Sequence, residues 1–111
     1  MNGIYYDNAE IKQDTFGNVE VDRVYYFDFS RFDEGAWSVM ENIYRSLPNQ
    51  SVKNGIGQQM WFGEEDISDS FLWSSVEPSG LQVVGYLKKE DWDEWKTAFH
   101  RLIRKLPFYD V

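Results

Sequence analysis

The last third of the chain carries a strongly amphipathic helical pattern, which restricts the folds that this protein can adopt. Between Asp91 and Leu106, large apolar residues recur at three- and four-residue spacings and therefore share one face of a helix. They are Trp92, Trp95, Phe99, Leu102, Ile103 and Leu106. Asp91 and Glu94 resemble a capping box at the start of this helix, and Pro107 ends it. Such a helix is stable only if a second layer covers its apolar face.

A second apolar stripe with helical spacing lies between Ser30 and Pro48. Its members are Ala36, Met40, Ile43, Tyr44 and Leu47. We expect Ser30 to cap this helix, with Asp33 as the acidic third residue of the cap, and Pro48 to stop it. The chain therefore contains two helices that both need an apolar surface to cover them.

Alternating apolar and polar residues predict strands that could supply this surface. In the clearest strand, residues 19–29, one face is largely apolar and the other carries acids. The second face contains Glu20, Asp22, Val24, Tyr26 and Asp28. A turn is expected at 16–18, and a tight turn at 77–80 has proline at its second position and glycine at its fourth. The other expected strands cover 3–6, 9–13, 58–62, 71–76 and 81–87.

These elements define an α+β fold with the order ββαβββα. A chain of 111 residues buries about two thirds of its unfolded surface, which supports one core rather than two. Aromatic residues make up 18% of the chain and supply large side chains for that core. We therefore expect a single domain over residues 1–111, in which an antiparallel sheet has two helices packed on one face.

The cysteine content predicts the cellular compartment, and the distribution of charge predicts the kind of partner. Because cysteine is absent, the chain can form no disulfide or thiolate site, and we expect a cytoplasmic protein. Residues 1–7 lack an export signal and no apolar run reaches about 20 residues, so no membrane association is expected. Residues 1–77 contain 14 acids and 5 bases, net -9, whereas residues 78–111 contain 5 acids and 6 bases, net +1. Such a surface repels nucleic acid and favours a basic protein partner.

The candidate binding residues are acids and aromatic residues expected on the sheet surface and in one acidic loop. Since two helices cover only one face of a sheet, the other face should carry the acids together with some aromatic side chains. An aromatic anchor inside a charged rim is typical of protein interfaces. The candidates are Glu20, Asp22, Tyr26, Asp28, Trp61, Glu64, Glu65, Asp66 and Asp69.

No residue pattern predicts catalysis. His100 is the only histidine and lies on the basic end of a helix, where we expect a structural or merely exposed role. The acids at 64–69 lack the alternating spacing and central glycine of a calcium loop. The glycines at 54–57 lack the Lys-Ser or Lys-Thr of a phosphate-binding loop. We therefore expect no enzymatic activity, no metal and no cofactor.

In size, acidity, aromatic content and lack of catalytic groups, the chain resembles the small bacterial immunity proteins that neutralise contact-dependent or other polymorphic toxins. The resemblance covers the whole chain as composition and element order. It implies a cytoplasmic, non-catalytic inhibitor that binds a cognate toxin domain tightly, for example a basic nuclease. In that class the inhibitor blocks either the active site of the toxin or an adjacent surface.

Two other interpretations are open at this point. A nucleic-acid mimic of the anti-restriction or anti-CRISPR type would display carboxylates spaced along its surface like phosphates. A small ligand-binding or enzymatic domain would line a concave aromatic pocket with Tyr26, Trp61 or Trp73 beside a perturbed carboxylate.

Overall fold

The structure is a computed structural model that describes residues 6–50, 58–63 and 68–109. Seven main elements follow one another in the predicted order ββαβββα, with a short 3-10 helix at Phe29–Arg31. They are β1 (Tyr6–Gln13), β2 (Asn18–Tyr25), α1 (Glu34–Ser46), β3 (Gln58–Trp61), β4 (Phe71–Glu77), β5 (Gly80–Lys88) and α2 (Lys89–Ile103). The predicted α+β class is confirmed.

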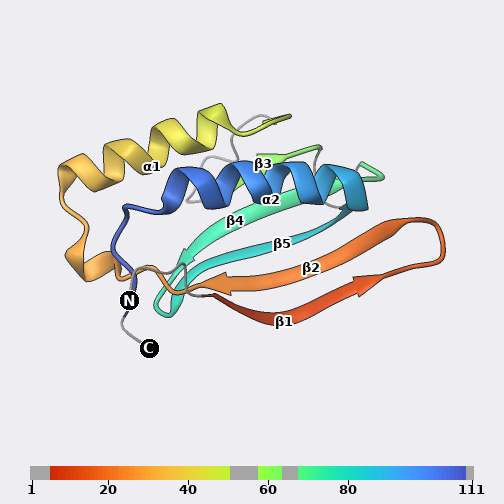
Figure 1. Ribbon diagram of the computed structural model, residues 1–111, viewed down its shortest axis with the longest axis horizontal. Helices are drawn as coiled ribbons and strands as arrows, with labels where there is room; N and C mark the ends of the chain where they lie inside the picture. Colours follow the sequence, from red (N-terminus) through yellow and green to blue (C-terminus); the bar gives the residue numbers. More distant parts are fainter. Residues whose placement is uncertain (1–5, 51–57, 64–67, 110–111) are drawn as a thin grey trace.

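The five strands form one antiparallel sheet in the order β1-β2-β5-β4-β3. β5 is central because β2 pairs with one of its edges and β4 with the other. Figure 1 shows α1 and α2 side by side on the same side of the sheet. One face of the sheet is therefore covered by helices, and we call the opposite face, which neither helix covers, the outer face.

The core lies between the sheet and the two helices. From β2 and β5, the residues that face the helices are buried: Val19, Val21, Tyr25, Leu81, Val83 and Leu87. The predicted stripe of α2 meets them, and the ring of its fully buried Trp95 lies 5.1 Å from that of Trp61 and 4.7 Å from that of Phe99. The helical periodicity therefore identified the buried face of α2 correctly.

The predicted cap of α1 is wrong by three residues. Asp33 is the N-cap, and its Oδ1 accepts a hydrogen bond from the Ala36 amide at 2.8 Å. Ser30 instead belongs to the 3-10 helix, whose N-cap is Asp28. The predicted strand 19–29 also ends early, at Tyr25. The residues that follow pair with the C-terminal segment instead, through an isolated bridge between Phe27 and Phe108, before Asp28 caps the 3-10 helix.

The start of α2 differs from the predicted capping box at Asp91. The helix begins at Lys89, directly after β5 ends at Lys88, and Lys88 makes no side-chain cap. The Lys89 amide donates to the carbonyl of Gly17 at 3.0 Å, which satisfies one of the free donors at the helix start. A backbone contact from a distant turn thus substitutes for a local cap.

Within the described residues, no helix is both long enough and apolar enough to cross a membrane.

Candidate functional site

The outer face of the sheet places side chains from three strands beside one another. Strand residues that alternate with the buried positions point to this face. Nine of them, along the middle of β2, β5 and β4, are Glu20, Asp22, Val24, Gln82, Val84, Tyr86, Phe71, Trp73 and Ser75. All but Glu20 are partly buried, although no helix lies over them. Because the three strands are paired in register, these side chains lie beside one another.

The middle of the outer face is apolar. Trp73 on β4 is paired in register with Val84 on β5, and Phe71 is paired with Tyr86. Cross-strand pairs of aromatic and β-branched residues of this kind stabilise a sheet through direct side-chain contact. We call these four residues the apolar centre. Half-buried aromatic side chains on the surface of a protein are the type of residue that anchors protein interfaces.

Acids flank the apolar centre on the β2 side. Glu20 is opposite Tyr86 and Asp22 is opposite Val84 in the β2–β5 register. Glu20 is exposed, whereas Asp22 Oδ1 accepts a hydrogen bond from the Gln82 amide nitrogen at 3.1 Å. Within the described part of the chain, neither acid forms an ion pair with lysine or arginine. Glu20 is therefore exposed beside the aromatic residues, whereas Asp22 is half-buried there, and Lys12 of β1 is opposite Glu20 in the β1–β2 register.

Hydrogen bonds to the β1–β2 turn hold Tyr86 in place on this face. Its hydroxyl donates to Asp14 Oδ2 and accepts from the Asn18 side-chain amide at 3.1 Å. The other oxygen of Asp14 accepts from the backbone amides of Phe16 and Asn18, both at 2.9 Å. The hydrogen bond from Tyr86, followed by that from Asn18, lowers the pKa of Asp14, and the same contact raises the pKa of Tyr86. One end of the apolar centre is thus fixed by hydrogen bonds.

The structure distributes the predicted binding residues over several environments. Glu20 and Asp22 lie on the outer face, Tyr26 is half-buried just beyond β2, and Asp69 is exposed in the segment before β4. The remaining loop acids lie outside the described residues: Glu64, Glu65 and Asp66. The outer face therefore unites two of the predicted acids with aromatic residues that the sequence did not assign to a face.

Two predicted binding residues, Asp28 and Trp61, are buried and do not belong to the outer face. Asp28 is occupied in capping the 3-10 helix. Trp61 points to the helices, where its Nε1 donates to the Tyr44 carbonyl at 3.3 Å. Its neighbour Met60 is paired with Trp73 and takes the position on the opposite face. The large aromatic side chain of Trp61 therefore belongs to the core.

A polar cluster that sequence patterns did not predict lies between β2 and α2. Arg23 is 5% exposed, its guanidinium lies 4.0 Å from the ring centroid of Tyr6, and its Nη1 donates to the Tyr25 hydroxyl at 3.1 Å. That hydroxyl is 2.8 Å from His100 Nε2. Because a guanidinium can only donate, the Tyr25 hydroxyl can direct its own proton to Nε2. Arg23 breaks the apolar alternation of β2, and this is the single sequence signal for the cluster.

The cluster is built to keep His100 neutral. Burial, then the positive charges of Arg23 and Lys96, lower the pKa of His100 to about 4. Burial likewise raises the pKa of Tyr25 to about 12. Both groups are therefore neutral near pH 7, and the Tyr25 hydroxyl links Arg23 to His100.

Neutral His100 makes stability depend on pH. The pKa of His100 is lower in the folded protein than in the unfolded chain. As the pH falls below about 6.5, the unfolded chain therefore takes up a proton on His100 while the folded protein does not. The free energy of unfolding consequently decreases as the pH falls from about 6.5 toward about 4. Between pH 7.5 and pH 5.0, this pKa difference would lower the free energy of unfolding by at most about 2 kcal/mol. Because the His100 ring is half-exposed, solvent screening reduces the expected loss to about 1 kcal/mol. Urea unfolding should show that His100→Gln loses about 1 kcal/mol less than the parent protein over this interval. Equal losses in both proteins would contradict the assignment.

Among the described residues, no group of three or more histidine, aspartate or glutamate side chains is placed to hold a metal ion. Comparison with protein-family models, with curated proteins and with solved structures finds no match.

Proposed function

We propose that this protein binds the basic surface of another protein through the outer face of its sheet and thereby inhibits that partner. The observation that carries the proposal is the apolar centre of Phe71, Trp73, Val84 and Tyr86 beside the acids Glu20 and Asp22, on a face that neither helix covers. The two parts of this surface have different physical roles in binding.

The apolar centre would provide most of the affinity. Aromatic side chains that become fully desolvated at the middle of an interface contribute a large share of the binding free energy. Tyr86 is already fixed by Asp14 and Asn18, so it loses little conformational freedom on binding.

The acids would mainly raise the rate of association and select a cationic partner. Charges at the rim of an interface steer the encounter of two proteins and repel partners of the same sign. An apolar centre next to the acids favours a protein partner over the role of a nucleic-acid mimic, which needs continuous rows of anionic groups.

An inhibitor of a basic enzyme is the function that these properties support best. The immunity proteins that neutralise toxins are the corresponding class, and a basic nuclease domain is the expected type of partner. In this proposal the protein is not itself an enzyme.

Reversing the charge of the outer face should slow binding. We expect Glu20→Lys combined with Asp22→Lys to reduce the on-rate for the captured partner by roughly tenfold at low salt, and much less at high salt. The experiment captures partners from the native host with the parent protein and measures association by surface plasmon resonance at two salt concentrations. The captured protein should also have an enzymatic activity that the parent protein inhibits.

The matched control changes the charge by the same amount on the helical side of the molecule. Glu90→Lys combined with Glu94→Lys replaces two exposed acids of α2 and should leave the on-rate within about twofold of the parent value. Equal slowing by both double variants would show that net charge, rather than the outer face, governs association. An unchanged on-rate for the outer-face variant would exclude this face as the binding surface.

A further inference from the structure

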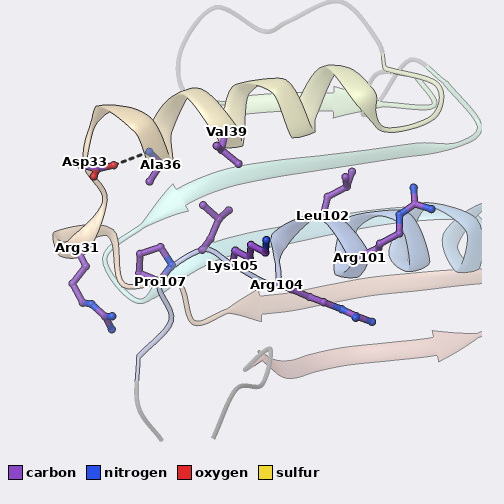
Figure 2. A pocket seen from close by; sticks show the side chains of 10 residues that line it. Arg31, Asp33, Ala36, Val39, Arg101, Leu102, Arg104, Lys105 and Pro107 are labelled. Atoms are coloured by element: carbon purple, nitrogen blue, oxygen red, sulfur yellow. Dashed lines mark hydrogen bonds between the residues drawn. The ribbon is translucent and has the colours of Figure 1, made fainter.

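A groove of about 600 Å³ lies between α1 and the C-terminal end of α2. It is on the helical side of the sheet and shares no lining residue with the outer face. Figure 2 shows Val39 of α1 and Leu102 of α2 directed into the space between the two helices. Ala36, Leu106 and Pro107 extend this apolar lining. Val39 is 46% exposed, so an apolar side chain faces solvent inside the groove.

Four basic residues also belong to the lining of the groove. They are Arg31, Arg101, Arg104 and Lys105, four of the eleven lysine and arginine residues in the chain. All four are exposed, and none forms an ion pair within the described part of the protein. Asp33 is the one acid among the lining residues, and its Oδ1 already accepts a hydrogen bond from the Ala36 amide. The groove is therefore cationic, although the protein has a net charge of -8.

We propose that this groove binds a small anionic amphiphile, namely an aliphatic carboxylate whose chain lies on the apolar lining while its head group meets the basic rim. Apolar surface with a few polar groups that fix orientation is the usual composition of a ligand site. Guanidinium groups bind carboxylates through charge-assisted hydrogen bonds.

The size of the groove favours a small molecule over a protein. Its volume of about 600 Å³ lies within the roughly 300–1,000 Å³ that is typical of small-molecule sites. Its lining contains ten residues, whereas a stable protein interface uses about 20–30 residues on each side. This site is independent of the proposed inhibitor function, because the outer face lies on the opposite side of the sheet.

The test is isothermal titration calorimetry with dodecanoate below its micelle concentration, at low salt. The parent protein should bind one dodecanoate saturably. Arg104→Glu should weaken binding by about tenfold, because it removes a charge-assisted hydrogen bond and adds repulsion. Val39→Glu, at an exposed helical position, should abolish binding by placing a carboxylate in the apolar lining. Circular dichroism and urea unfolding would verify that both variants are folded.

Two controls separate this site from non-specific attraction. Lys88→Glu makes the same charge change at an exposed residue at the opposite end of α2 and should alter the affinity by less than about twofold. Dodecyltrimethylammonium, with the same chain and the opposite charge, should not bind. Absence of dodecanoate binding, equal binding of the cation, or equal weakening by Lys88→Glu would each overturn the proposal. Binding of an acidic amphipathic peptide in place of dodecanoate would also overturn it, by assigning the groove to a protein partner.

Discussion

Trp95→Ala is expected to lower the free energy of unfolding by about 3–5 kcal/mol. The Trp95 side chain is fully buried, and its ring contacts those of Trp61, Trp92 and Phe99 at centroid distances of 5.1, 5.9 and 4.7 Å. Truncation removes contacts with both the sheet and the helix and leaves a cavity that the surrounding rings cannot fill. Domains of this size have a total stability of about 5–15 kcal/mol, so the variant should be close to unfolding at 37 °C. Chemical denaturation monitored by circular dichroism measures the difference.

Trp37→Ala is the matched control, because it removes the same side chain from the other helix at a partly exposed site. Trp37 is 38% exposed and stacks on Phe29 with a centroid distance of 5.3 Å. Losing this stacking and partial burial should cost about 1–2 kcal/mol. If the two variants lost equal stability, the apolar stripe of α2 would not be the centre of the core.

Gly80→Ala is expected to destabilise the domain by about 2–4 kcal/mol. Gly80 has a φ of 142°, which side chains rarely adopt, and it begins β5 directly after the two-residue turn from β4. A Cβ atom here would overlap the carbonyl oxygen of Tyr25 and lie 3.0 Å from its carbonyl carbon. Because these are backbone atoms of the neighbouring strand, they cannot move aside as a flexible side chain would. Urea denaturation provides the measurement.

Gly17→Ala distinguishes backbone strain from this steric overlap. Gly17 also has a positive φ, 83°, but no atom lies within 4 Å of the position that its Cβ would occupy. Alanine there should cost only the left-handed conformational penalty of about 1 kcal/mol. The loss at Gly80 should therefore exceed that at Gly17 by at least about 1 kcal/mol. Equal losses would mean that the close approach of Gly80 to Tyr25 does not restrict this position.

The sequence by itself determined the kind and order of the elements, because these depend on local periodicity. The stripe that includes Trp92, Trp95 and Phe99 fixed the buried face of α2, and the alternation in β2 placed Glu20 and Asp22 on the same face. Helix starts were predicted less well. The Gly17 carbonyl, remote in sequence, contacts the first amide of α2, and sequence spacing alone cannot reveal such a contact.

The tertiary structure decided which side of each strand is inside and which distant residues meet. A period of two places Met60 and Trp61 on opposite faces, but only the position of the helices assigns Trp61 to the core. The hydrogen bond between Tyr25 and His100 joins residues 75 positions apart, and the groove combines the start of α1 with the end of α2. Such contacts depend on how the layers pack. Local periodicity fixes which residues share a face and leaves that packing open.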